Sequence, residues 1–325
     1  MRRWWLLLVA LLLAPVASAA PPGPPAPAGS PVAEHGRLAV KGNRVVDAQG
    51  RPYAVRGMSL FWSQWQPRYY DPATVAWLAS DWRVTAVRAA IAGQQGGYDT
   101  QPAAETKRAE AVIDAAIAQG IYVVVDWHAH QPRADDAVRF FRHIATKYRG
   151  VPNLVYETYN EPLPEHGWAT VLKPYHAKVI GAIRAIDPDA FVVAGTRSWS
   201  QDVDEAAADP LPFANVAYTL HFYAATHKAE LRAKADRAMQ RGIALFVTEY
   251  GTTAANGDAP IDAKETQTWW DWCAKNGVSY LNWSVANKDE ASAILKPTTQ
   301  ALSGWTEGDL TESGRLVRAH LRAVR

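Results

Sequence analysis

The sequence has little of three things that would point to particular classes of protein. Cys273 is its only cysteine, so no disulfide can form within the chain, and the core alone must stabilise the fold. Lys and Arg total 34 against 32 Asp and Glu, and this net charge of +2 gives no reason to expect a nucleic acid as partner. Beyond the N-terminus, no apolar run is long enough to span a membrane.

The first 33 residues differ in composition from the rest of the chain. A short basic start and an apolar run precede Ala17-Ser18-Ala19, which is typical of a secretory signal peptide over residues 1–19. The run is too short for a spanning helix, and an uncleaved N-terminal anchor is the alternative. Residues 20–33 are rich in proline and predict an extended linker. We therefore expect a secreted or periplasmic protein that has no membrane contact after cleavage.

Residues 34–325 alternate between strand-like and helix-like runs. Leu38–Asp47 is typical of a small hairpin across a Gly-Asn turn. The eight runs that follow are separated mostly by helical patterns such as Ala103–Gln119, and this rhythm predicts one α/β domain, a (β/α)8 or TIM barrel. The expected strands are Tyr53–Ser59, Thr85–Ala89, Ile121–Asp126, Asn153–Thr158, Phe191–Gly195, Asn215–Leu220, Ile243–Thr248 and Val278–Trp283.

Polar and aromatic residues stand where most of these strands end, and the active site of such a barrel lies at those ends. Two of them are glutamates, Glu161 in Asn160-Glu161-Pro162 and Glu249 in Thr248-Glu249-Tyr250. Two carboxyl groups facing one cleft are what a retaining glycosidase needs. One attacks the anomeric carbon, and the other protonates the leaving oxygen.

Each glutamate by itself has a structural interpretation. Glu161 could support a helix that begins at Pro162, and Glu249 could belong to a buried ion pair. Their pairing favours catalysis over both. His128-Ala129-His130 is also a metal-ligand pattern, so a metal-dependent barrel hydrolase is one rival. A non-catalytic glycan-binding barrel is the other, although it would be expected to lack one of the acids.

The 14 tryptophans suit the apolar faces of sugar rings, but many must be core. Trp199 and Trp305 fall in expected loops and are candidates for binding sugar on the leaving-group side. We expect four other tryptophans, which fall within an expected helix or at the entry to a strand, to be structural: Trp82, Trp269, Trp270 and Trp272.

The motifs in this order resemble glycoside hydrolase family 5, in clan A of the barrel glycosidases, and within it the bacterial endo-β-1,4-glucanases. The resemblance extends from Gly36 to the C-terminus. It implies hydrolysis of internal bonds of cellulose or related β-glucans by double displacement, by a monomer, without a metal or an organic cofactor. A β-mannanase or xyloglucanase with the same mechanism is the alternative. Beyond the two glutamate motifs, the matching segments are Arg56–Ser59, Val87–Ala90, Gly96–Tyr98, Asp126–His128, Gly195–Val203, His221–Tyr223 and Asn282–Ser284.

The resemblance also implies a role for each matching residue. Glu161 is expected to be the acid/base and Glu249 the nucleophile. The residues expected to support them are Arg88, His128, Asn160, His221 and Tyr223. The residues expected to bind the sugar chain are Trp65, Trp283, Lys288, Glu290 and Trp199.

Two positions depart from the family pattern. Phe61 stands near the place where a histidine is common, and Ala92 stands where a tyrosine is frequent. Both are expected to affect the outer subsites on the non-reducing side and to leave the bond-breaking chemistry unchanged.

Overall fold

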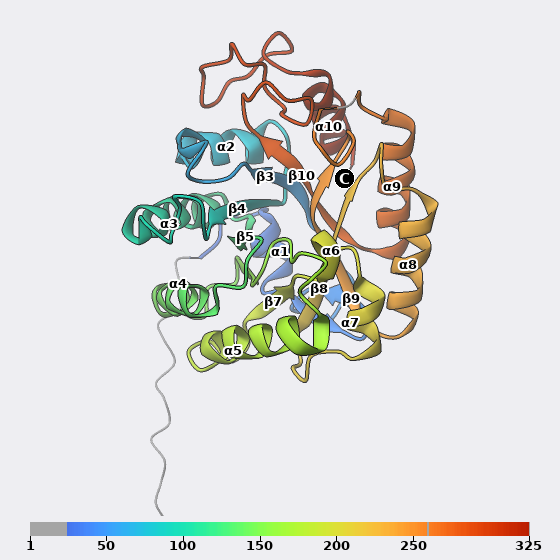
Figure 1. Ribbon diagram of the computed structural model, residues 1–325. Coiled ribbons are helices and arrows are strands. Elements are labelled where there is room, and N and C mark those ends of the chain that lie inside the picture. Colours follow the sequence, from blue (N-terminus) through green and yellow to red (C-terminus); the bar gives the residue numbers. More distant parts are fainter. Residues whose placement is uncertain (1–24, 259, 325) are drawn as a thin grey trace, which may run out of the picture.

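In the computed structural model, eight parallel strands close into a barrel with helices around it (Figure 1). The structure describes residues 25–258 and 260–324, so the predicted signal peptide and the first part of the proline-rich segment lie outside it. Neighbouring strands follow the chain order, and the last pairs with the first. The predicted fold class is confirmed. The strands are β3 (Arg56–Leu60), β4 (Ala86–Ala92), β5 (Tyr122–His128), β6 (Leu154–Glu157), β7 (Phe191–Ala194), β8 (Val216–Tyr223), β9 (Ala244–Gly251) and β10 (Ser279–Val285).

Helices connect the strands and cover the outside of the barrel, as the crossover connections of parallel strands require (Figure 1). Among the described residues, none of these helices combines the length and the apolar character needed to cross a bilayer. The α-helices after the first barrel strand are α2 (Pro72–Ser80), α3 (Pro102–Gln119), α4 (Ala134–Lys147), α5 (Lys173–Arg184), α6 (Arg197–Ser200), α7 (Val203–Ala208), α8 (Ala229–Gln240), α9 (Ala263–Asn276) and α10 (Glu312–Ala323). A 3₁₀ turn at Pro67–Tyr69 and a π-helical turn at Trp168–Leu172 complete the set.

Two short elements at the N-terminus lie against the barrel end opposite to the strand C-termini. The predicted hairpin is present as β1 (Ala39–Lys41) and β2 (Arg44–Val46), paired antiparallel. It follows the helix α1 (Pro31–His35), and apolar residues of both join the cluster that fills the barrel interior. The members of that cluster include Val32, Leu38, Val45, Tyr122, Val124, Phe191, Phe246 and Leu281.

The predicted linker is wrong at its C-terminal end, because α1 begins at Pro31 inside the expected extended segment. Proline is tolerated in the first turn of a helix, where its missing N–H would have no partner. The side chain of Ser30 caps the helix by accepting a hydrogen bond from the Ala33 backbone. The backbone N–H of Val32 donates to the Gly120 carbonyl at 2.9 Å, and its side chain is buried. The composition of the segment gave no sign of these contacts, which stabilise α1.

Several strands extend further toward the active-site end than predicted. The predictions ended β4 at Ala89 and β8 at Leu220, whereas the strands continue to Ala92 and Tyr223. The prediction for β8 stopped before His221, on the assumption that polar residues mark a loop, whereas the residues after Ala89 are apolar and gave no reason to end β4 there. In the structure His221 and Tyr223 lie at the barrel mouth and contact the two glutamates, so β8 continues through them.

A bulge in β9 brings two consecutive side chains to the same side. Ala244 and Phe246 lie in the barrel interior, while Leu245 and Val247 belong to the cluster between barrel and helices. Pairing with β8 then moves from Thr219 opposite Phe246 to His221 opposite Glu249, so β9 contains one extra residue. The pairing with β10 shows the same shift. As a result, both Thr248 and Glu249 reach the active-site end of the interior, which regular alternation would forbid.

Gly57 in β3 is predicted to be irreplaceable by alanine, because an added Cβ would lie 1.7 Å from the Ala86 carbonyl oxygen. We expect Gly57→Ala to lower the free energy of unfolding by about 3 kcal/mol or more. The matched control is Gly181→Ala within α5, where an added Cβ meets no atom within 4 Å. That variant should gain about 0.5–1 kcal/mol from helix propensity. Denaturant unfolding of both variants measures the difference, and equal small effects would contradict the close strand packing.

Candidate active site

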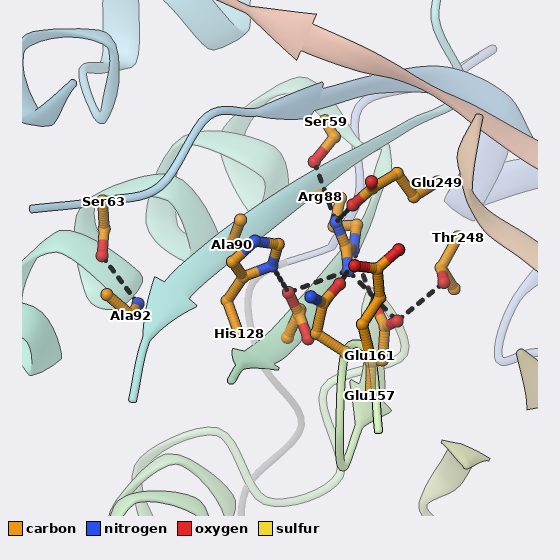
Figure 2. A network of polar contacts seen from close by, with 12 residues as sticks. Ser59, Ser63, Arg88, Ala90, Ala92, His128, Glu157, Glu161, Thr248 and Glu249 are labelled. Atoms are coloured by element: carbon orange, nitrogen blue, oxygen red, sulfur yellow. Dashed lines mark hydrogen bonds and ion pairs between the residues drawn. The ribbon is translucent and has the colours of Figure 1, made fainter. Parts of the chain in front are cut away.

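The buried side chain of Arg88, on β4, lies at the centre of the barrel mouth (Figure 2). It donates to Glu157 from Nε at 2.7 Å and from Nη2 at 3.2 Å, and to Glu249 from Nη1 at 3.0 Å. Nη2 also donates to Oδ1 of Asn160 at 2.7 Å and lies 2.9 Å from an Asp126 oxygen. Burial alone would lower the pKa of Arg88, but the surrounding carboxylates raise it above its ordinary value. The guanidinium therefore stays charged and orients groups that lie on β5, β6 and β9 or directly after β6.

Glu249 lies near the end of β9 with both carboxylate oxygens engaged. Arg88 donates to Oε2, and the hydroxyl of Tyr223 donates to Oε1 at 2.7 Å. Burial raises the pKa of Glu249, as does the nearby Glu161, whereas His221, Arg88 and Tyr223 counteract this. The pKa of Tyr223 is itself well above its ordinary value because of burial, so its hydroxyl keeps the proton that it donates.

Glu161 follows β6 and lies in a different environment. Its Oε1 is 3.0 Å from Nδ1 of His221, and its Oε2 is 3.8 Å from Nδ1 of His130. It makes no hydrogen bond to Arg88 or to a tyrosine among the described residues. Burial raises the pKa of Glu161 from 4.5 to about 7, an effect that His130 and Arg88 reduce only in part. This carboxyl group therefore holds a proton at a pH where ordinary glutamates have lost theirs.

One oxygen of Glu161, one of Glu249 and one nitrogen of His221 all lie within 4.8 Å of one another. Three such groups are also close enough to approach one cation. However, both nitrogens of His221 and both carboxylate oxygens of Glu249 already have hydrogen-bond partners. The trio is therefore better suited to proton transfer and attack on carbon than to holding a metal.

His128, at the end of β5, supports the floor of the site. Its Nδ1 donates to Asp126 at 2.6 Å, and burial lowers its pKa well below the ordinary value. The ring stacks on Trp283, with centroids 5.1 Å apart and planes 6° from parallel. Trp62 meets the same ring edge-on at 4.2 Å. These contacts hold the His128 ring and Trp283 in fixed orientations at the base of the cleft.

Two adjoining hollows extend away from the pair of acids, and both include Glu161, Tyr223 and Ala255 in their linings. The first has a volume of about 390 Å³ and is lined by Trp199, Gln201 and His227 as well. The second, of about 230 Å³, contains Glu249 and continues along a row of aromatic and charged side chains. Its further lining residues include Phe61, Trp62, Trp65, His128, Trp283, Lys288 and Glu290. The acids thus lie partway along an elongated cleft.

Comparison with known proteins agrees with this geometry. The family model described as cellulase, glycosyl hydrolase family 5, matches residues 46–289. The chain belongs to this family. Endoglucanase Z of Dickeya dadantii is 43% identical over 292 residues, which are 88% of this chain and 66% of that protein. An endoglucanase of Clostridium saccharobutylicum is 40% identical over 288 residues, covering 87% of this chain and 64% of the relative. The chain therefore spans slightly less than two thirds of the length of these curated relatives.

Solved structures are similar over nearly the whole barrel. A structure from Cytophaga hutchinsonii has a TM-score of 0.89 and 47% identity, covering 90% of this chain and 97% of that one. The catalytic domain of Thermobifida fusca endoglucanase Cel5A, solved in complex with cellotetraose, has a TM-score of 0.87 and 33% identity. That match covers 90% of this chain and 100% of the other.

The structure of this family 5 member brings together most residues that the sequence singled out. Four of the predicted residues contact the two acids or Arg88 between them, namely Arg88 itself, Asn160, His221 and Tyr223. His128 and Trp283 line the same hollow as the acids. Trp65 and Trp199 are 50% and 42% exposed and line different hollows. Lys288 and Glu290 form an ion pair with each other at the second hollow.

Trp305 does not belong to the site, which corrects one prediction. It is buried against Trp82, and its Nε1 donates to the Ala301 carbonyl at 2.9 Å. A tryptophan in a loop was expected to be accessible, but this loop folds back onto α2 and α10. The tryptophans that we expected to be structural are all buried: Trp82, Trp269, Trp270 and Trp272.

Several residues of the site had no predicted role. Glu157 and Asp126 are fully buried carboxylates that bind Arg88. A charged residue inside an apolar strand was a usable signal for both, since such a group needs a partner when buried. Thr248 and Trp62 gave no local signal, because threonine and tryptophan are ordinary strand and core residues.

The raised pKa of Glu161 should be visible in protein stability. The folded state keeps the Glu161 proton up to about pH 7, whereas the unfolded chain loses it near 4.5. Folding stability contributed by this group is therefore present below pH 4.5 and is lost as the pH rises to 7. We expect Glu161→Gln to be more stable than the wild type by about 2–3 kcal/mol at pH 8, and by much less at pH 4.5.

Denaturant unfolding at several pH values measures this difference. The exposed Glu165, four residues away, offers a matched control as Glu165→Gln. A constant difference between Glu161→Gln and wild type across this range would show that Glu161 titrates like an ordinary glutamate.

Proposed function

We propose that this protein is an endo-acting β-1,4-glucanase that hydrolyses cellulose or related β-glucans with net retention of configuration. The observation that carries the proposal is the pair of carboxyl groups, Glu161 and Glu249, held within 4.8 Å in different environments. Carboxyl groups about 5–5.5 Å apart permit direct attack on the anomeric carbon, whereas inverting enzymes keep theirs further apart to accommodate a water molecule.

The contacts of the two carboxyl groups favour Glu249 as the nucleophile. Arg88 and Tyr223 both donate to Glu249, and both stabilise its ionised form. Glu161 lacks these donors and retains its proton, so it is suited to be the general acid. Because the two groups are close, the negative charge of Glu249 further disfavours ionisation of Glu161.

The reaction then has two steps. Glu249 attacks the anomeric carbon while Glu161 transfers its proton to the glycosidic oxygen, so that bond breaks and a glycosyl-enzyme forms. In the second step Glu161, now ionised, removes a proton from a water molecule whose oxygen attacks the same carbon and releases Glu249. Both steps develop positive charge at the sugar ring, which the buried carboxylates around Arg88 stabilise electrostatically.

The shape of the cleft supports a chain-like substrate cut at internal bonds. Exposed Trp65 and Trp199 line the two hollows on either side of the acids, and aromatic faces of this kind stack on sugar rings. The endoglucanase from Thermobifida fusca was solved with cellotetraose, a β-1,4-linked glucose chain. Phe61, packed on Trp283 at 5.1 Å, makes the second hollow more apolar than a histidine would. We infer that binding there depends mainly on stacking.

The proposed enzyme acts after export. The signal-peptide prediction concerns residues outside the described part, and it remains the basis for proposing secretion or a periplasmic location. Cys273 is buried, which suits a protein that folds without a disulfide in an oxidising compartment. We propose that the enzyme acts as a monomer and requires no metal or organic cofactor.

The roles of the two acids predict different losses in two variants. Glu249→Ala should reduce hydrolysis to less than about one thousandth, and azide should restore turnover by forming a glycosyl azide of inverted configuration. Glu161→Ala should lose about 10²–10⁴-fold on a β-glucan polymer, yet still release an activated phenol whose departure needs no proton. Steady-state rates on both substrates, with and without azide, test this. Equal losses of Glu161→Ala on both substrates would remove its assigned role.

The activity itself predicts a simple pattern on soluble carboxymethyl-cellulose. Viscosity should fall much faster than reducing ends accumulate, because internal cuts shorten chains before they release small sugars. Addition of a chelator should leave the rate unchanged, and the first products should keep the β configuration when followed by NMR. A panel with mannan and xyloglucan identifies the preferred polymer. Loss of activity with chelator, or α-configured first products, would overturn the proposal.

A further inference from the structure

A chain of hydrogen bonds links Glu161 to the buried interior of the barrel. Nδ1 of His221 lies 3.0 Å from Oε1 of Glu161, and Nε2 of the same ring lies 2.9 Å from the Thr248 hydroxyl. Thr248 in turn lies 2.7 Å from Oε1 of Glu157. Glu157 and Thr248 are fully buried and His221 nearly so, and Figure 2 shows Thr248 and Glu157 joined below Glu161.

The direction of these hydrogen bonds follows from the charge on Glu157. Arg88 donates two N–H groups to the two oxygens of Glu157, which marks it as a carboxylate that can only accept. Thr248 has one hydroxyl proton and must donate it to Glu157. The oxygen of Thr248 is then free to accept from His221, so the proton of that ring resides on Nε2. If Glu157 were protonated, every bond of this chain could run the opposite way.

His221 carries a single ring proton in this environment. Burial lowers the pKa of His221 to about 4; the charges of Arg88 and His130 act in the same direction, whereas Glu249 and Glu157 oppose it. With its proton on Nε2, the neutral ring presents a lone pair at Nδ1. Nδ1 can therefore only accept a hydrogen bond from Glu161, and only a protonated Glu161 can donate one.

The bulge in β9 is what makes this arrangement possible. Thr248 and Glu249 are consecutive, yet Thr248 contacts Glu157 and His221 while Glu249 contacts Arg88 and Tyr223. In a regular strand one of the two would point toward the helices. The extra residue thus lets Glu249 face the site while the Thr248 hydroxyl lies next to the histidine of the neighbouring strand β8, from which it accepts a hydrogen bond.

We propose that Thr248 and Glu157 are positioning residues that hold His221 in its Nε2–H form and thereby keep the acid proton on Glu161. The proposal depends on the role of Glu161 proposed above. The Nε2–H form of His221 also accounts for the basicity of Glu161 in the second step of the reaction. Once Glu161 has given up its proton, its carboxylate faces the lone pair of His221 without a hydrogen bond, which makes it a stronger base toward water.

The test replaces Thr248 by valine, which has nearly the same shape but no hydroxyl group. In Thr248→Val, His221 loses its acceptor and can move its proton to Nδ1, where it donates to the Glu161 carboxylate and stabilises the ionised form. We expect the alkaline limb of kcat/KM on soluble β-glucan to move about one pH unit lower, as for loss of a hydrogen bond to the neutral form. Thr248→Ser keeps the hydroxyl and should keep the wild-type limb. The other titratable and charged groups that face Glu161 are unchanged in both variants, and they are His130, Arg88, Asp126, Glu157, Tyr223 and Glu249.

A second measurement detects the histidine directly and does not depend on activity. In ¹⁵N-histidine NMR at neutral pH, the His221 signal, assigned by its loss in His221→Gln, should show the Nε2–H tautomer in the wild type and in Thr248→Ser. An Nδ1–H tautomer in the wild type would overturn the proposal even if Thr248→Val did not fold. The proposal would also be overturned if the alkaline limb of Thr248→Val did not move and its activity fell equally on glucan and on an activated aryl glycoside. A wild type without glucanase activity would instead overturn the proposed function and leave the tautomer assignment valid.

Discussion

The active site depends on a single buried positive charge. Arg88 lies within reach of Asp126, Glu157 and Glu249, which come from three different strands. Without the guanidinium, three buried carboxylates would face each other with little screening by solvent. Removing one partner of a buried ion pair leaves an uncompensated charge, which typically costs about 3–5 kcal/mol. The barrel mouth is therefore a set of mutually dependent charges, in which ion pairs with Arg88 hold the three carboxylates together.

The barrel could be predicted from sequence because its signals are local and repeated. Apolar runs such as Ile121–Asp126 alternate with helical patterns, and helix ends are marked by residues such as Gly120. Two features escaped this reasoning. The helix α1 starts inside a proline-rich stretch, where its stability comes from contacts with Gly120 and the barrel interior. The bulge in β9 comes from pairing with two neighbouring strands, and no single strand sequence reveals pairing register.

The convergence of the two acids and their immediate partners could also be predicted, since each is an unusual residue at a strand end within a recognisable motif. Glu157 and Thr248 could not, although they are as close to the chemistry as some predicted residues. Their importance lies in the direction of hydrogen bonds, which depends on how Arg88 binds Glu157 across the barrel. The prediction that Trp305 binds sugar was wrong for a different reason. Its loop position resembled that of Trp199, but only tertiary packing distinguishes a buried ring from an exposed one.

Burial acts on both acids in the same direction, so burial by itself cannot assign their roles. It raises the pKa of Glu161 and of Glu249 alike. The difference comes from the donors that each carboxyl group meets. Glu249 receives two, from Arg88 and Tyr223, whereas Glu161 faces a neutral histidine that is itself held by Thr248. Arg88 donates to Glu249 directly and, by binding Glu157, orients the hydrogen bonds of Thr248 and His221 away from donation to Glu161. The same guanidinium thus separates the proposed nucleophile from the proposed acid.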